Sequence, residues 1–145
     1  MKIGKVLKLE VYGESHAPKI GMRLEGFPAG LKIDFDALKA FMERRAPGRD
    51  EFSTPRREPD EPQFISGVKD GVTTGETIEA VIVNTNTRSG DYEKSIPRPG
   101  HADYPAQCKY HGFQDSRGGG HFSGRITAAL VAAGAICKCA LSHKG

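Results

Sequence analysis

Apolar and polar residues alternate near the N-terminus with the period of a half-buried β-strand. Leu7, Leu9 and Val11 form one such run, and Met22 and Leu24 form a second. Residues 77–83 read TIEAVIV and predict a further strand. Asp70 and Gly71 stand between residues 65–68 (ISGV) and this later strand, which is typical of a hairpin turn. Antiparallel pairing is therefore favoured over a doubly wound sheet, and the predicted fold class is α+β.

Two segments carry apolar residues at helical spacing. The first runs from a cap at Asp34 to about Arg45, with an apolar face that ends before Pro47 and Gly48. The second runs from near Ser123 to about Leu141, and its apolar residues surround the helix axis almost completely. We therefore expect the second helix to be buried between layers of structure.

Composition limits the class of protein. A chain of 145 residues, 37% hydrophobic and 27% charged, predicts one folded domain spanning residues 1–145. The apolar run 128–136 is shorter than the roughly 20 residues needed to cross a bilayer, and lysines interrupt the apolar stretch at the N-terminus. The predicted location is therefore cytoplasmic, with no membrane partner.

Cysteine content and charge argue against two further classes of site. An odd number of cysteines without metal-ligand spacing predicts reduced thiols and no metal site. The net charge of +3 is mild, and the aromatic residues do not interleave with the basic ones, so a nucleic-acid partner is disfavoured.

Residues 84–120 form a long segment without clear periodicity, which in a compact domain usually means function or disorder. Its mixture of charged and aromatic side chains favours function. It contains the peptide RPGHADY (98–104), in which His101 follows Pro-Gly, although a lone histidine in such a turn is more often simply solvent-exposed.

The same segment closes with three glycines, Gly118 to Gly120, before the second helix. Glycines leading into a helix N-terminus allow backbone N–H groups to approach an anion. Arg125 lies in the first turn of that helix, where its charge opposes the helix dipole. Two explanations remain open: an anionic ligand offsets the conflict, or Arg125 pairs with a distant carboxylate or reaches solvent.

Taken together, these segments resemble the chorismate synthase family over essentially the whole chain, in family order and spacing. RPGHADY and GESH are similar to the family's two histidine signatures. The matching segments are GESH (13–16), GFPAG (26–30), RRAPG (44–48), STPRREPD (53–60), SGVKDGVTTG (66–75), NTNTRSGDY (84–92), RPGHADY (98–104), FQDSRGGGHFSGR (113–125) and AAGAI (132–136).

The resemblance implies a reaction and a fold. The reaction is the 1,4-anti elimination of phosphate from 5-enolpyruvylshikimate 3-phosphate to give chorismate, with reduced FMN required but not consumed and NADPH as a possible reductant. The fold is a sandwich of helices between two antiparallel sheets, of which this chain would supply the N-terminal half. The family also implies a homo-oligomer, a tetramer, and a small anionic substrate.

The resemblance further implies roles for individual residues. His16 matches the histidine that assists the leaving phosphate, and His101 matches the one that manages the proton on the reduced flavin. Ser15, Arg45 and Arg125 match substrate-binding positions. Arg44, Arg49 and Arg56 are weaker candidates, with a solvated basic face as the alternative. The cofactor-binding positions are Arg45, His101, His121, Phe122, Ser123 and Arg125.

The chain departs from the family pattern in two ways. After the three glycines it reads HFSGR where RSSARET is commoner, so flavin contacts there would depend more on backbone. Family members are also more than twice this length, and their C-terminal half brings further FMN contacts. The alternative function is therefore a non-catalytic module, derived from the N-terminal half, that binds anions or mediates oligomerisation.

Overall fold

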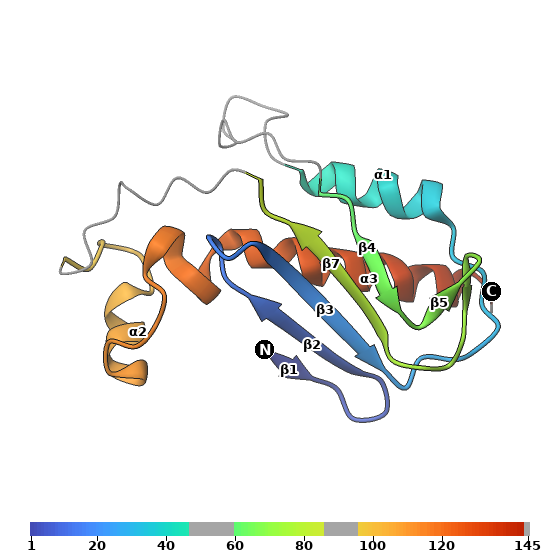
Figure 1. The fold of residues 1–145 in the computed structure, drawn as a ribbon, viewed down its shortest axis with the longest axis horizontal. Coiled ribbons are helices and arrows are strands. Elements are labelled where there is room, and N and C mark those ends of the chain that lie inside the picture. Colours follow the sequence, from blue (N-terminus) through green and yellow to red (C-terminus); the bar gives the residue numbers. More distant parts are fainter. Residues whose placement is uncertain (47–59, 86–95, 144–145) are drawn as a thin grey trace.

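Five antiparallel strands form a single sheet with helices on one face (Figure 1). The computed structural model describes residues 1–46, 60–85 and 96–143. Within these ranges the strand order is β1-β2-β3-β7-β4, and every pairing is antiparallel. The α+β prediction is confirmed. The strands are β1 (Lys2–Ile3), β2 (Lys8–Gly13), β3 (Lys19–Glu25), β4 (Gln63–Ser66) and β7 (Ile78–Val83).

The predicted hairpin at Asp70 and Gly71 is present, but it joins two short strands. β5 (Val68–Lys69) pairs with β6 (Val72–Thr73) in a separate two-stranded sheet, and the chain continues from there to β7. Asp70 and Gly71 have φ of 51° and 78°, the left-handed conformation that tight two-residue hairpin turns require.

The strand register separates an apolar face from a charged face. Leu9, Leu24 and Ile78 are paired across three strands on the inner side. The neighbouring row pairs Glu10 with Arg23 and Arg23 with Glu79, and it lies on the opposite face because side chains alternate along a strand. One face therefore packs against the helices and the other meets solvent.

Helix α1 (Phe35–Arg45) begins and ends where the sequence predicts. The carboxylate of Asp34 caps it by accepting a hydrogen bond from the backbone N–H of Ala37 at 2.9 Å. The helix stops at Ala46, whose extended ψ of 135° is the conformation favoured before a proline. Leu38 and Met42 are the residues it buries.

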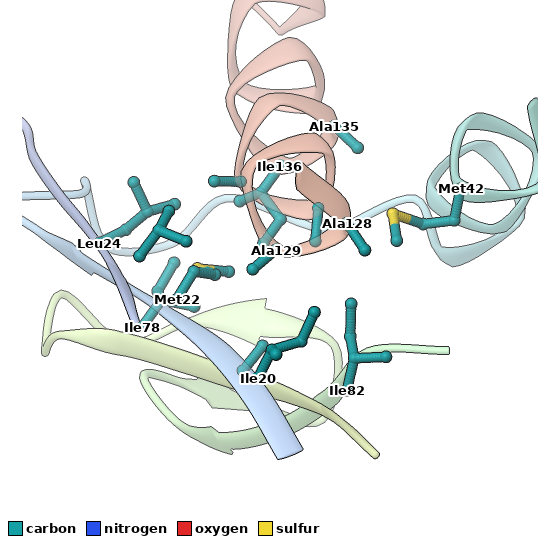
Figure 2. Packing of buried hydrophobic residues seen from close by; sticks show 14 of the residues in the cluster. Ile20, Met22, Leu24, Met42, Ile78, Ile82, Ala128, Ala129, Ala135 and Ile136 are labelled. Carbon is teal, nitrogen blue, oxygen red and sulfur yellow. The ribbon is translucent and has the colours of Figure 1, made fainter. Parts of the chain in front are cut away.

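Helix α3 (Thr127–Ser142) follows a short 3₁₀ turn, η2 (Gly124–Ile126), and crosses the inner face of the sheet beside α1. Small residues on α3, such as Ala128, Ala129 and Ala132, allow it to lie close to the sheet. Figure 2 shows the large side chains of β3 and β7 pointing toward it, with Met42 of α1 reaching in from the side.

The expected burial of α3 between two layers is present on one side only, as half of a sandwich would leave it. Leu130 is 38% exposed and Leu141 is 70% exposed. The sheet and α1 cover one side of α3, and among the described residues no layer covers the other side. The helical stretch Gly124–Ser142 has a mean hydropathy of 1.5 and is long enough to cross a membrane. Half of its most apolar part is buried inside the protein, as is typical of the core helix of a folded domain.

The described part of the segment 84–120 holds more regular structure than its lack of periodicity predicts. Helix α2 (Asp103–Tyr110) lies within it, and a 3₁₀ turn, η1 (Arg117–Phe122), begins in it. Asp103 opens α2 and Pro105 follows within its first turn, where a missing N–H costs no hydrogen bond. His111 ends α2 in the left-handed conformation. RPGHADY is therefore a turn running into a helix, not a loop throughout.

Candidate functional site

Three loops converge at one end of the sheet. GESH begins at the last residue of β2 and continues into the turn toward β3, Asn84 directly follows β7, and η1 contains the three glycines (Figure 1). The backbone N–H of Ser15 donates to the carbonyl of Gly120 at 3.1 Å. The buried Asn84 amide donates to the carbonyl of Ala17 at 2.7 Å. The structure thus joins motifs that lie far apart along the chain.

The glycine turn lies against both candidate histidines. Gly118, Gly119 and Gly120 all have positive φ, of 55°, 86° and 53°. A Cβ atom on Gly118 would lie 2.2 Å from Cε1 of His16, and one on Gly119 would lie 2.5 Å from Cε1 of His101. Real Cβ atoms essentially never come so close to another heavy atom. Glycine is therefore required for the backbone to lie between the two imidazoles.

His101 is held by the residues that flank it. Its Nδ1 lies 3.1 Å from Oδ1 of Asp103. The guanidinium of Arg98 contacts both oxygens of the same carboxylate, with Nε 2.7 Å from Oδ2 and Nη2 2.8 Å from Oδ1. Hydrogen bonds from Arg98 hold the pKa of the Asp103 carboxyl far below its usual range. Asp103 is therefore ionised at neutral pH.

Ser15 lies beside the same turn. Its side chain is almost fully buried, and Oγ would be 3.0 Å from a Cβ on Gly118. Its neighbour His16 is half-buried. The structure therefore brings Ser15, His16 and His101 together around two consecutive glycines.

The two principal candidate arginines share one buried carboxylate. Asp60, whose side chain is 1% exposed, accepts hydrogen bonds from Arg45 through Oδ2 and from Arg125 through Oδ1. Arg125 also donates through Nε to Oδ1 of Asn84 at 2.8 Å and through Nη2 to the carbonyl of Val83 at 3.4 Å. The charge of Arg125 was expected to be offset either by an anionic ligand or by a distant carboxylate. In the structure it pairs with a distant carboxylate, that of Asp60.

Arg45 and Arg125 differ in how far they remain accessible. The side chain of Arg125 is 4% exposed, and that of Arg45 is 21% exposed. Arg45 reaches from α1 to the carbonyl of Gly124 at 3.2 Å, next to the start of α3. Arg44 is exposed, with its guanidinium 5.5 Å from the ring centroid of Phe41. Arg49 and Arg56 lie outside the described residues.

His121 and Phe122, the first two residues of the HFSGR segment, line a neighbouring cleft. Nδ1 of His121 lies 3.1 Å from the carbonyl oxygen of Gly13, and the Phe122 ring is 43% exposed. Ser123 accepts a hydrogen bond through Oγ from the backbone N–H of Arg125 at 3.3 Å. The cleft has a volume of about 480 Å³ and is also lined by Tyr110 and Phe113.

Two carboxyl groups lie beside His121 and have opposite pKa shifts. Hydrogen bonds from Arg117 lower the pKa of Asp115 to about 2. Burial, together with the nearby Asp115, raises the pKa of Glu14. Asp115 therefore carries the negative charge of this pair at a lower pH than Glu14. Within the described ranges, no group of three or more His, Cys, Asp or Glu side chains could hold a metal ion.

Sequence reasoning had named the motifs that contain Asp60, Asn84 and Asp103 but assigned these residues no role. Asp60 is the last residue of one motif and Asn84 the first residue of another. Asp103 follows His101 by two residues. For Asn84 the available signal was a polar residue directly after an apolar strand. Which residue it contacts could not be read from the sequence, because the partners come from distant elements.

The fold and the site together define a class of protein. It is an α+β protein in which a glycine turn presents two histidines beside a buried arginine–carboxylate cluster. The family model described as chorismate synthase matches residues 7–145. The chain belongs to the chorismate synthase family.

Individual relatives agree with this assignment. The chain is 46% identical over 144 residues to the chorismate synthase of Thermococcus kodakarensis, covering 98% of this chain and 40% of the relative. It is 49% identical over 136 residues to that of Campylobacter lari, covering 94% and 37%. A crystal structure of chorismate synthase superposes with a TM-score of 0.67 at 29% identity, covering 97% of this chain and 35% of the other. The chain thus spans about 40% of the length of these relatives.

Proposed function

We propose that the protein containing this segment is a chorismate synthase, a lyase of the shikimate pathway. It would convert 5-enolpyruvylshikimate 3-phosphate to chorismate by 1,4-anti elimination, in which a ring C–O bond to phosphate and a ring C–H bond break and a new C=C bond forms. The observation that carries the proposal is the glycine turn, in which His16 lies against Gly118 and His101 lies against the next residue, Gly119.

His16 is proposed to assist the leaving phosphate. The phosphate develops charge as the C–O bond breaks, and an imidazolium N–H can meet that charge with a proton or a hydrogen bond at neutral pH. His16 and the buried Ser15 lie on the Gly118 side of the turn, which supports a shared role toward the substrate. The substrate itself carries two carboxylates and a phosphate, about four negative charges.

His101 is proposed to hold or transfer a proton next to the flavin. It lies on the Gly119 side of the turn, and its other edge is fixed by Asp103. Reduced FMN, when bound, would supply electron density transiently as the C–O bond breaks. The protein's part is to place a proton-exchanging nitrogen at a defined position.

The residues around the turn fit an anionic, planar group. Positive φ at three consecutive glycines lets the backbone lie against the imidazoles of His16 and His101, so at the turn both rings stand beside main chain and not beside a third side chain. Arg45 is the accessible arginine of the cluster, and guanidinium groups bind carboxylate and phosphate in fixed orientation. His121 and the exposed ring of Phe122 would contribute flavin contacts on the cleft side, and Ser123, next along the chain, would add a further contact outside the cleft lining.

Arg125 would act mainly as the support of this arrangement. Its guanidinium is bonded to Asp60, Asn84 and Val83, so it binds ligand only if one of these contacts is exchanged. We further propose a cytoplasmic homotetramer in which NADPH can serve as the reductant for FMN.

The test is phosphate release. Full-length protein with reduced FMN under anaerobic conditions should release one phosphate for each chorismate formed from 5-enolpyruvylshikimate 3-phosphate. No release by well-folded, flavin-loaded protein would contradict the proposal. The non-catalytic module makes a different prediction, that the native protein has an intact mass close to the 15.7 kDa of this chain.

A further inference from the structure

The peptide from Arg98 to Asp103 forms a self-contained unit around His101. Gly100 has φ of 72°, and the backbone N–H of His101 donates to the carbonyl of Arg98 at 3.3 Å, which closes a turn. Asp103 then begins α2, and its Oδ2 accepts from the backbone N–H of Arg98 at 3.0 Å. The turn at Arg98 and the start of α2 together hold the Asp103 carboxylate beside the His101 imidazole.

We propose that Asp103 is a positioning residue that keeps the proton of neutral His101 on Nδ1 and leaves Nε2 as the nitrogen that exchanges a proton during turnover. The part of the inference that concerns turnover rests on the proposed function. Its structural part, the choice of nitrogen, is measurable without any turnover.

The choice of nitrogen follows from the chemistry of the carboxylate. Ionised Asp103 can only accept hydrogen bonds. Oδ1 lies 3.1 Å from Nδ1 of His101, so this approach is attractive when Nδ1 carries hydrogen and repulsive when it presents a lone pair. Nη2 of Arg98 is also within hydrogen-bonding distance of Nδ1, at 3.5 Å, and as a donor it would favour the opposite tautomer. The ionised carboxylate is the closer neighbour, at 3.1 Å, and we take its negative charge to favour hydrogen on Nδ1.

The opposite edge of the ring faces the site. A Cβ on Gly119 would lie 2.5 Å from Cε1 and 3.0 Å from Nε2, but 3.7 Å from Nδ1. Nε2 is therefore the ring nitrogen nearer the glycine turn. When Nε2 accepts one proton, Nδ1 keeps its own, and the imidazolium charge is compensated by Asp103. When Nε2 gives the proton up, the starting tautomer returns.

The arginine partner makes Asp103 a stable acceptor. Arg98 occupies Oδ2 through Nε and through its backbone N–H, and it shares Oδ1 through Nη2. A bidentate guanidinium of this kind holds the carboxylate in one orientation. Because its pKa is lowered, Asp103 stays an ionised acceptor for Nδ1 across the pH range in which histidine titrates, whether the ring is neutral or protonated.

The experiment measures the tautomer of His101 by nitrogen-15 NMR in the full-length protein. In the wild type, Nδ1 should give the protonated-type shift and Nε2 the unprotonated-type shift above the pH at which the ring is neutral. Asp103→Asn should increase the Nε2–H form, because an amide N–H can donate to Nδ1. Asp115→Asn is the matched control. Asp115 binds the guanidinium of Arg117 as Asp103 binds that of Arg98, so both variants remove a carboxylate paired with an arginine, but Asp115→Asn should leave the His101 signals unchanged.

Kinetics then test whether the positioning matters. Asp103→Asn should lower kcat by about tenfold or more with little change in KM for the substrate, because it alters the proton at the reacting centre and not substrate binding. In a His101→Ala background the same substitution should have no further effect, since Asp103 acts through His101.

Two results would overturn the positioning inference: a wild-type His101 that carries its proton on Nε2, or an Asp103→Asn variant that keeps the Nδ1–H tautomer. The first result is measured on the wild-type protein, so it tests the inference even where Asp103→Asn fails to fold. An additive loss of kcat in the double variant would equally contradict action through His101. Normal turnover by His101→Ala would instead refute the proposed function of His101 while the measured tautomer stands.

Discussion

Gly119 combines two properties that can be separated by substitution. Its φ of 86° disfavours any side chain, and a Cβ there would also collide with the ring of His101. Gly30 has a similar φ of 81°, but nothing lies within 4 Å of the position its Cβ would take. The pair therefore distinguishes backbone strain from displacement of the histidine.

We predict that Gly30→Ala and Gly119→Ala each lose about 1–2 kcal/mol of unfolding free energy from left-handed backbone strain. Only Gly119→Ala should also lose turnover, by about tenfold or more, because small misplacements of a catalytic group are costly. Urea unfolding and steady-state kinetics on full-length protein measure the two effects. Equal turnover in both variants would contradict a site at the glycine turn.

The histidines themselves should matter for catalysis more than for folding. His16 lies in a turn and His101 precedes α2, and neither belongs to the apolar core. His16→Ala and His101→Ala should each change stability by no more than about 1 kcal/mol while lowering turnover by roughly two to four powers of ten.

The two histidine variants should also differ from each other. Loss of His101 should change the absorbance of bound reduced flavin as a function of pH, whereas loss of His16 should weaken the response to the substrate's phosphate and leave that spectrum alone. Identical spectra for both variants would argue against separate roles.

At the scale of elements, Asp60 ties together the ends of elements whose apolar side chains also meet in the core. Its two oxygens accept hydrogen bonds from Arg45 at the end of α1 and from Arg125 in η2, just before α3. Arg125 also bonds Val83 and Asn84 at the end of β7 and directly after it. Removing one partner of a buried ion pair leaves uncompensated charge in the interior.

Asp60→Asn is therefore expected to lower the free energy of unfolding by about 3 kcal/mol or more. The matched control is Glu25→Gln, which breaks the exposed ion pair with Lys8 and should cost less than about 1 kcal/mol. Chemical denaturation of the two variants provides the comparison. A loss at Asp60 no greater than at Glu25 would show that the cluster is not a structural support.

The solvent face of the sheet has its own electrostatic signature. Tyr12 donates to the carboxylate of Glu79 at 2.5 Å, and the Arg23 guanidinium lies 4.9 Å from the centroid of its ring. Burial and the hydrogen bond to Glu79 raise the pKa of Tyr12 to about 12. Because the folded-state pKa is raised, this contribution to stability is present below the unfolded pKa of about 10 and is lost as pH rises through 12.

Alkaline titration followed by tyrosinate absorbance should therefore show one tyrosine that ionises late. The late step should vanish in Tyr12→Phe and persist in Tyr104→Phe, since Tyr104 is 65% exposed. A late step that survives in Tyr12→Phe would assign the raised pKa to another residue.

At the scale of the whole molecule, the uncovered side of α3 predicts self-association. Leu130 and Leu141 are exposed on a helix whose other side forms the core (Figure 2). Exposed apolar surface on this scale is typical of an interface or a missing layer. The 145-residue chain alone should therefore sediment as an oligomer or aggregate and bind a hydrophobic dye. A monomer that binds no dye would contradict this prediction.

The sequence by itself determined the elements whose signals are local. The alternation in β2 and β3, the Asp34 cap, the stop at Ala46 before proline and the apolar period of α3 each depend on neighbours within a few residues, so these elements were predicted close to their observed bounds. Family membership was also readable, because the order and spacing of motifs are properties of the sequence.

Tertiary structure alone decided which distant residues meet. The contact of Asp60 with both arginines, the fit of Gly118 and Gly119 against His16 and His101, and the exposed side of α3 depend on how the sheet, the helices and the turns pack. Helix α2 was missed because its apolar period is weak and its start depends on Asp103 pairing with Arg98. Such contacts follow from the three-dimensional arrangement of the chain, and the local periodicity of a sequence carries no record of them.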